Sequence, residues 1–180
     1  AKELYLNECL VKDIKIPEGV TRLGTFAFCN SAAITSIALP EGFTNIEKGA
    51  FYNCSNLKKI TFPNSLTNIG DSAFGGCSGL VSINIPSTTE AIGKYAFLSC
   101  NALTEVTIPT SVIYIGARAF FITDGPLVIT MEDTEGWYTY DSYQNERTDI
   151  SSEELADPTK ASTYLKLDKS FWDWRKYSEE

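Results

Sequence analysis

Three cysteines at a regular spacing are the first residues in this sequence that could do chemistry. Cys54, Cys77 and Cys100 are each 23 residues apart, and Cys9 and Cys29 stand outside this series. Thiolates can bind metals or exchange disulfides. The chain has no histidine and no C-x-x-C pair, so the residues that usually complete a zinc site are missing. We therefore predict a column of small buried side chains, one from each structural repeat, and expect no cofactor.

A group of acidic residues is the second candidate for chemistry. Asp124, Glu132, Asp133 and Glu135 could supply oxygen ligands for Ca²⁺, which takes roughly six to eight of them. Their spacing matches no known Ca²⁺-binding loop, and we predict no metal site. No G-x-S-x-G motif is present, and a serine nucleophile would have no histidine as its base. The sequence predicts a protein that is not an enzyme.

The C-terminal part of the chain is rich in aromatic residues and acidic charge. Trp137, Trp172 and Trp174 are the three tryptophans of the chain. Stacking of aromatic rings on sugars would make this part a glycan-binding module, but a small hydrophobic core is the favoured interpretation. Residues 132–180 carry a net charge of −7 out of a total of −8. Without a basic cluster we expect no nucleic-acid partner, and without about 18 consecutive apolar residues we expect no membrane span.

A unit of 23 residues carries these side chains and is repeated along the chain. Each copy contains an Ala-Phe pair and, earlier in the unit, a proline. A fixed period of about 20 to 50 residues is the signature of a solenoid. The prolines are Pro17, Pro40, Pro63, Pro86 and Pro109, and the phenylalanines are Phe28, Phe51, Phe74, Phe97 and Phe120.

The residue types within one unit predict its local structure. The L-x-x-I-x-I segment ends in period-two alternation, which indicates a strand with one buried face. Proline follows, where a strand leaves its ladder. A second short extended segment then ends in T-x-I-G, where glycine is expected to allow a tight bend. The Ala-Phe segment is expected to form a short helical or 3₁₀ turn, with the ring at the centre of the coil.

This repeat resembles that of BspA-like, or treponemal-type, leucine-rich repeat surface proteins. The shared pattern C-x-x-L-x-x-I-x-I-P-x-x-V-T-x-I-G-x-x-A-F covers residues 5 to about 131, with Glu47, Ser31 and Thr89 as small departures. The resemblance implies an α/β solenoid: a right-handed leucine-rich-repeat stack of 23-residue coils, with a parallel strand ladder, short helical or 3₁₀ turns and a small C-terminal cap. It also implies an extracellular or cell-surface location on bacteria, adhesion or protein recognition, and no catalytic activity. The chain begins at Ala1, and we expect a processed or trimmed form without its signal peptide.

Two domains are expected, with residues 1–131 as repeats and residues 132–180 as a capping module. The repeats comprise a partial first unit, about five full units and a sixth strand over residues 127–131. A solenoid end exposes its core, so Leu4, Leu6 and Leu10 should need a cover at the N-terminus. In the fifth unit, Ile113-Tyr114 and Phe121-Ile122 replace polar residues, which indicates an apolar surface that the tail covers. The predicted cap interface is Ile113, Tyr114, Phe121 and Trp137.

Within the tail we expect two extended segments and one helix. Residues 136–143 alternate like a strand, residues 144–152 are polar and predicted to be a loop, and residues 171–176 are predicted to be extended. Asp157 and Pro158 are typical of an N-cap and a first helical residue, which predicts a helix over residues 159–165.

The outward positions of the first strand in each unit form the predicted ligand face. They are small and mixed in charge, without aromatic or arginine anchors. The candidate residues are Lys59, Thr61, Asn84, Glu105 and Thr107. We predict a domain that recognises an unidentified host or microbial surface protein. A glycan-binding module that uses the C-terminal aromatics, or a structural spacer without a ligand, are the alternatives.

Overall fold

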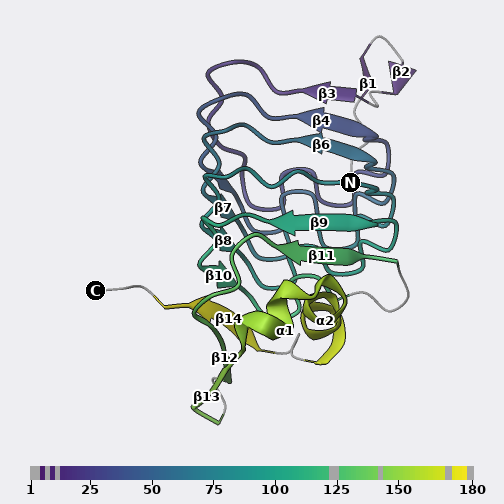
Figure 1. Ribbon diagram of the computed structural model, residues 1–180. Helices are drawn as coiled ribbons and strands as arrows, with labels where there is room; N and C mark the ends of the chain where they lie inside the picture. The colour runs from purple at the N-terminus through teal and green to yellow at the C-terminus, as the bar shows by residue number, and fades with distance from the viewer. Residues whose placement is uncertain are drawn as a thin grey trace.

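The coils of the chain stack on one another along a single axis and form a solenoid (Figure 1). A computed structural model describes residues 5–6, 9–10, 13–121, 126–141, 144–168 and 172–177. Leu4, Ile122 and Asp124 lie outside the described residues, as do the side chains of Leu6 and Leu10. The stack of 23-residue coils with parallel strands agrees with the predicted fold class. No helix in the described ranges is both long enough and apolar enough to cross a bilayer.

The first strand of each unit builds one side of the stack, here called the strand ladder. Its strands are β3 (Asp13–Lys15), β4 (Ser36–Ala38), β6 (Lys59–Thr61), β9 (Glu105–Ile108) and β11 (Val128–Met131). All pairings within it are parallel, and each residue lies beside its own equivalent 23 positions away. In β6, Ile60 is buried while Lys59 and Thr61 are exposed, as the period-two alternation predicted.

The second extended segment of each unit contributes to another parallel sheet, here called the second sheet. It continues into the tail. Tyr114 in this sheet lies opposite Arg175, and the tail strands all pair antiparallel. The parallel strands are β5 (Asn45–Ile46), β7 (Asn68–Ile69), β8 (Ala91–Ile92) and β10 (Tyr114–Ile115), and those of the tail are β14 (Asp173–Lys176), β12 (Trp137–Asp141) and β13 (Glu146–Asp149). A separate antiparallel pair joins β1 (Tyr5–Leu6) and β2 (Cys9–Leu10).

The structure of the tail confirms both predicted extended segments and shows that the prediction of a loop between them was wrong in part. Strands β12 and β14 lie where residues 136–143 and 171–176 were expected to be extended. The polar segment expected to be a loop instead contains β13. All four of its side chains are exposed, so its place in the sheet depends on backbone pairing with β12 and not on burial. A polar strand of this kind has no hydrophobic pattern to reveal it.

Two short helices and a π-helical turn complete the tail. They are α1 (Ser152–Ala156), α2 (Pro158–Thr163) and η1 (Tyr164–Asp168). Asp157 is the N-cap of α2, as predicted, and its Oδ1 accepts from Thr159 N at 2.8 Å. Helix α1 was missed, although Ser151 and Glu154 form a capping box that the S-x-x-E spacing signals. In Figure 1 both helices lie at the end of the stack, next to β11.

The glycine that ends T-x-I-G is required by close packing and not by a tight bend. A Cβ atom added to Gly70 would lie 2.5 Å from Ile46 O, and one added to Gly93 would lie 2.6 Å from Asp71 N. Both atoms belong to the backbone of the preceding coil. Glycine at this position therefore lets consecutive coils approach each other.

The Ala-Phe segment is a series of single turns. Ala73 N donates to Gly70 O at 3.2 Å and Gly75 N donates to Ser72 O at 3.1 Å, so the bonds are of the i to i+3 type expected for 3₁₀ turns. A left-handed residue two positions before the phenylalanine keeps the turns from joining into a helix. These residues are Phe26, Gly49, Ser72, Tyr95 and Arg118, with φ between 54° and 60°.

Two columns of identical side chains fill the core. The five repeat phenylalanines stack with centroids 5.2–5.5 Å apart and ring planes within 10° of parallel. Beside them, the thiols of Cys54, Cys77 and Cys100 are fully buried, which confirms the predicted cysteine column. Each thiol donates to the carbonyl of the phenylalanine 26 residues before it, at 3.0, 3.1 and 3.2 Å. Burial raises the pKa of Cys54 to about 11 and that of Cys100 to about 12, so these thiols stay protonated.

Candidate binding face on the strand ladder

The exposed side chains of the strand ladder form two parallel rows. The register of β3, β4 and β6 places Asp13, Ser36 and Lys59 side by side in the first row. The same strands place Lys15, Ala38 and Thr61 in the second row. The coils that follow add Ser82 and Glu105 to the first row and Asn84 and Thr107 to the second. The predicted ligand-face residues all lie on this face, and all five of them are exposed: Lys59, Thr61, Asn84, Glu105 and Thr107.

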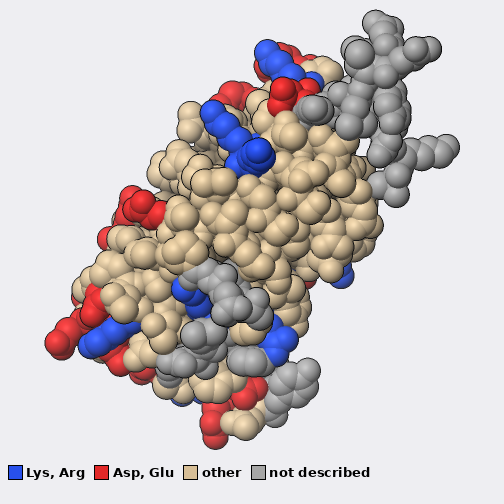
Figure 2. All heavy atoms as spheres, turned by 90° about the vertical axis from the view of Figure 1, so that its right-hand side faces the viewer, with Lys and Arg blue, Asp and Glu red and all other residues tan. Residues whose placement is uncertain are grey.

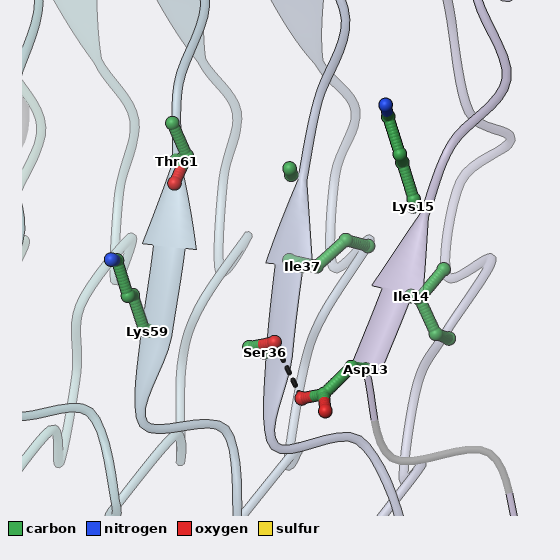
Figure 3. A pocket seen from close by; sticks show the side chains of 8 residues that line it. Asp13, Ile14, Lys15, Ser36, Ile37, Lys59 and Thr61 are labelled. Atoms are coloured by element: carbon green, nitrogen blue, oxygen red, sulfur yellow. Dashed lines mark hydrogen bonds between the residues drawn. The ribbon is translucent and has the colours of Figure 1, made fainter.

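The first feature of this face is a shallow hollow of about 280 Å³ across β3, β4 and β6, here called the N-terminal hollow. It contains Lys59 and Thr61, together with Lys15, Ser36 and Ala38. Figure 3 shows Lys15 on β3 and Lys59 on β6, on either side of β4. Small side chains on β4 leave the space between the two lysines open.

Asp13 also lines the N-terminal hollow, but its carboxylate is engaged by neighbouring hydroxyl groups. Its Oδ1 accepts from Ser36 Oγ at 2.6 Å, the bond drawn in Figure 3, and from Thr35 Oγ1 at 3.0 Å. Both donors belong to the next coil. This carboxylate therefore ties β3 to β4.

A second hollow of about 230 Å³, the C-terminal hollow, contains the other three predicted residues. Asn84, Glu105 and Thr107 line it, together with Ser82 and Glu132. Glu132 Oε2 accepts from Thr110 N at 3.2 Å. The sequence pattern brought Glu132 to attention only as a possible metal ligand, because its place in the same hollow as Glu105 depends on the sixth strand.

The C-terminal hollow lies where the strand ladder is interrupted. Ser82 makes an isolated bridge to Lys59, and in the described part of the chain no ladder pairing joins this coil to β9. The backbone bonds at its edge are long: both Val81 N to Lys58 O and Thr104 N to Val81 O measure 3.4 Å. The corresponding bond from Lys58 N to Thr35 O measures 2.9 Å. The hollow thus adjoins a looser part of the stack.

A third hollow, of about 470 Å³, lies beside the second sheet and contains none of the predicted residues. Its two charged residues, Arg22 and Glu47, pair with each other at 3.8 Å. On the face shown in Figure 2, the middle of the stack is mainly uncharged and charged side chains gather toward its ends. The strand ladder is therefore the face on which predicted residues and hollows coincide.

The side chains of the two ladder hollows can make polar contacts with a ligand. They provide ammonium, carboxylate, hydroxyl and amide groups on an accessible face. Among the residues that the structure describes, three or more potential metal ligands do not come together. Such groups can form ion pairs and hydrogen bonds with a ligand that lies along the stack.

Comparison with known proteins supports the leucine-rich-repeat fold of the chain. The family model of the BspA type leucine-rich repeat region matches residues 2–124 in six copies. The chain belongs to this family. A search of curated proteins found no match.

Solved structures of bacterial leucine-rich repeat proteins are similar to this BspA-type chain. A protein from Bacteroides ovatus is 35% identical with a TM-score of 0.62, over 66% of this chain and 33% of its own. A T. pallidum leucine-rich repeat protein is 28% identical with a TM-score of 0.56, over 70% of this chain and 54% of its own. The pneumococcal vaccine antigen PcpA shares the fold at 23% identity and a TM-score of 0.60, over 73% and 33%. The chain thus spans between a third and about half of these proteins.

The predicted cap interface of the BspA-type chain is formed largely by backbone pairing. Tyr114 lies in β10 against β14, and Phe121 is partly buried with the Arg118 guanidinium 5.6 Å from its ring centre. Ile113 O accepts from Lys176 N at 2.9 Å. The side chain of Ile113 nevertheless remains 50% exposed, which differs from the expectation that the tail covers it. Strand pairing covers the edge of the sheet and leaves this side chain outside.

Trp137 and Trp174 form the core of the tail and are unavailable to a ligand. They are 2% and 1% exposed, with ring centroids 6.5 Å apart in an edge-to-face arrangement. Trp137 Nε1 donates to Asp133 O at 3.0 Å. Trp172 is partly exposed. No coplanar pair of exposed tryptophans exists in the described part of the tail, so the favoured core interpretation is supported.

The sequence analysis missed a cluster on the tail that consists of Tyr138, Tyr177 and Arg147. The Arg147 guanidinium lies 4.5 Å from the ring centre of Tyr138 and 4.1 Å from that of Tyr177. The two rings are tilted by 50°. Because the arginine covers both rings and they are not coplanar, they do not form a flat platform for a sugar.

Asp173 joins the tail to the repeats and was also missed. It is buried, its Oδ1 accepts from Ala117 N at 3.0 Å, and its Oδ2 lies 3.4 Å from Lys94 Nζ. In the coil before, Asp71 Oδ1 accepts from Lys94 N at 2.8 Å. In the next coil, Lys94 occupies the repeat position of Asp71, and its ammonium group cannot accept a hydrogen bond from Ala117 N. Asp173 of the tail therefore supplies the acceptor that this coil lacks. Together with burial, the charge of Asp173 raises the pKa of Tyr114.

Proposed function

We propose that this chain is a non-enzymatic repeat domain that recognises a partner protein through its strand ladder, at a bacterial cell surface or outside the cell. The observation that carries the proposal is the position of the five predicted residues. Three line the C-terminal hollow and two line the N-terminal hollow, and all lie on one face. Membership of the BspA-type family supports protein binding, and resemblance to BspA-like surface proteins supports the location.

We further propose that residues 1–131 are the recognition module and residues 132–180 are its cap. Pairing of β14 with β10 supports this division at the second sheet. At the strand ladder, Ser162 and Lys166 bond the backbone of the last strand. A capped end keeps the solenoid soluble and leaves the ladder face as its binding surface.

The ladder face suits an extended partner better than a compact one. Its side chains are small and polar, whereas aromatic and arginine residues usually dominate tight interfaces. Individual contacts should therefore be weak and distributed along the stack. Many copies on one surface would strengthen attachment by multivalency.

Capture of partners by the purified chain tests the proposal. The chain is incubated with host matrix proteins and with bacterial surface extracts, and bound proteins are titrated for saturation. The double variant Thr61→Arg with Asn84→Arg places two long side chains on the ladder face. The matched control Asn45→Arg changes an exposed strand residue of the second sheet.

A saturable partner that the ladder variant loses and the control retains supports the proposal. Circular dichroism and thermal unfolding establish that each variant is folded. A partner that binds both variants equally places recognition elsewhere. If neither source yields a saturable partner, the chain is better described as a spacer without its own ligand.

Glycan binding is the less well supported alternative, because Trp137 and Trp174 are buried and Arg147 covers two of the tyrosines. Titration with a glycan array tests it directly. Saturable glycan binding that survives the ladder variant would favour this alternative over recognition by the ladder.

A further inference from the structure

The two hollows of the strand ladder have opposite charge. Lys15 and Lys59 lie in the N-terminal hollow, where the remaining charged residue is Asp13. Glu105 and Glu132 lie in the C-terminal hollow, whose lining includes no lysine or arginine. The ladder face is therefore positive at one end and negative at the other.

The two lysines are available to a ligand. Both are exposed, and within the described ranges neither forms an ion pair. Their strands lie on either side of β4 and their positions differ by two residues in register, so their backbones are about 12 Å apart at the usual spacings. Two small residues of β4 stand between them, Ala38 beside Lys15 and Ser36 beside Lys59. Their flexible stems can both reach an anionic group placed above Ala38.

The two glutamates are available in the same way. Glu105 is exposed and forms no ion pair in the described part of the chain. Glu132 uses Oε2 to accept from Thr110 N, which leaves Oε1 to a ligand. A carboxylate oxygen from each residue can therefore accept from a cationic group. A lysine or arginine side chain is the cationic group that a protein ligand would supply.

The distance between the hollows sets the spacing of the ligand charges. Ala38 and Glu105 are three coils apart, which corresponds to about 14 Å at the usual strand spacing. An extended polypeptide rises about 3.3 Å per residue and crosses this distance in about four residues. Thr61 in the N-terminal hollow and Asn84 in the C-terminal hollow belong to the two middle coils, where their polar groups can bond the backbone of the ligand.

We infer that the strand ladder recognises an extended segment of a partner protein in which an acidic group and a basic group are about four residues apart. The acidic group pairs with Lys15 and Lys59, and the basic group pairs with Glu105 and Glu132. This inference rests on the proposed function, because it names the chemistry of the partner for the same face. An anionic glycan would match the N-terminal hollow alone and would be repelled by the C-terminal hollow.

Defined peptides test the inference without knowledge of the natural partner. The first probe is a blocked peptide of serine and glycine with two aspartates and two lysines, centred about four residues apart. The second has the same composition with alternating charges, and the third and fourth carry only the aspartates or only the lysines. Binding is followed by chemical-shift changes of the ¹⁵N-labelled chain. Because exposed ion pairs each contribute little, we expect the first peptide to bind roughly three- to tenfold more tightly than the second.

Charge reversal locates the effect on the ladder. The variant Lys15→Glu with Lys59→Glu should bind the first peptide at least about threefold more weakly, since two attractions become repulsions. It should bind the lysine peptide more tightly, because both hollows are then acidic. The control Lys48→Glu reverses an exposed lysine away from the ladder face and should change neither affinity.

Several outcomes would overturn the inference. Equal affinity for the first and second peptides would exclude a requirement for separated charges. Binding of the aspartate peptide as tightly as the first would indicate an anionic ligand, such as an acidic glycan. If Thr61→Arg with Asn84→Arg abolishes capture of a natural partner but the charge reversal does not, the ladder binds a partner of different chemistry. In that case the proposed function stands and this inference falls.

Discussion

At the scale of single residues, cysteine, a reactive residue type, serves here as part of the buried core. Cys54, Cys77 and Cys100 occupy one repeat position, and each donates to a phenylalanine carbonyl of an earlier coil. Only the thiolate is nucleophilic, and burial opposes its formation. For Cys54 the pKa of about 11 leaves roughly one thiol in a thousand ionised at pH 8. These cysteines are therefore inert while the chain is folded.

Thiol reactivity tests this conclusion. In the variant Cys9→Ser with Cys29→Ser, the three remaining thiols should not react with Ellman's reagent at pH 8 in the folded chain. All three should react at once in denaturant, because unfolding exposes them. In the unchanged chain, the partly exposed Cys29 should be modified without denaturant. A rapidly reacting thiol in the folded double variant would contradict the buried column.

The raised pKa of Cys54 also predicts how stability depends on pH. Between the unfolded pKa of 9.0 and the folded pKa of about 11, the unfolded chain releases its proton first. The free energy of unfolding should therefore be unaffected by this group below pH 9 and should fall as the pH rises toward 11. The variant Cys54→Ser, which copies Ser31 at the same repeat position, should show a smaller fall. The measurement is the midpoint of urea unfolding from pH 8 to 10.5, and identical slopes for the two proteins would refute it.

At the scale of elements, the close contact between consecutive coils depends on a glycine at one repeat position in three of the copies, Gly70, Gly93 and Gly116. The backbones of neighbouring coils meet at this residue, so even a methyl group would overlap with a backbone atom. At Gly93 an added Cβ would lie 2.6 Å from Asp71 N, whereas at Gly24 it meets nothing within 4 Å among the described residues. The same repeat position is thus sterically closed in one coil and open in another.

Alanine substitutions at these two glycines test the close approach. Gly93→Ala should lower the free energy of unfolding by about 2 kcal/mol, because overpacking forces the coils apart. Gly24→Ala should be neutral or slightly stabilising, since alanine restricts the unfolded chain. Chemical denaturation measures both. Equal destabilisation by the two substitutions would show that a glycine backbone conformation, and not the packing, decides this position.

The join between β10 and β14 depends on a buried carboxylate. Asp173→Ala should cost about 1–3 kcal/mol of stability, because Ala117 N and Lys94 lose a partner in a largely buried position. The matched change Asp71→Ala removes a similar bond to Lys94 N in an exposed position and should cost less than about 1 kcal/mol. Thermal unfolding of both variants provides the comparison. A larger effect for Asp71→Ala would mean that Asp173 does not hold the tail in place.

At the scale of the whole molecule, the tail ends both sheets of the stack in different ways. The second sheet ends in an antiparallel strand, since Lys176 N donates to Ile113 O at 2.9 Å. The strand ladder ends under α2 and η1: Ile129 N donates to Ser162 Oγ of α2 at 2.7 Å, and Lys166 Nζ of η1 donates to Leu127 O at 3.2 Å. An unpaired strand edge invites association with another chain. The tail therefore closes the two edges at the C-terminal end of the stack.

Removal of residues 132–180 tests this closing role. The truncated chain should aggregate or form large oligomers, because β10 loses β14, β11 loses its bond to Ser162, and Ile129 and Phe121 become more exposed. Size-exclusion chromatography with light scattering measures the assembly state. The milder variant Ser162→Ala removes one backbone bond and should remain monomeric but less stable. A truncated chain that is monomeric and soluble would contradict the role of the tail as a cap.

Sequence reasoning succeeded where contacts join equivalent positions of neighbouring coils. Phe51, Cys54 and Ile60 each lie beside their own equivalents, so a local pattern repeated every 23 residues determines the core, the strands and the outward row positions. That is why the solenoid and the residues of the ladder face could be predicted from residue types and spacing. The physical reason is that a solenoid coil contacts mainly its neighbours, and the period identifies which residues those neighbours contribute.

Only the tertiary structure decided the features that break this regularity. The bond from Ala117 to Asp173 joins residues 56 positions apart, and β13 has no apolar pattern, so neither leaves a periodic signal. The grouping of Lys15 with Lys59 and of Glu105 with Glu132 arises from the register of the strands and from the sixth strand. The sequence alone thus determined the repeated scaffold and its reactive-looking but buried cysteines. The fold decided which variable residues meet, because meeting depends on distances in space that no spacing along the chain records.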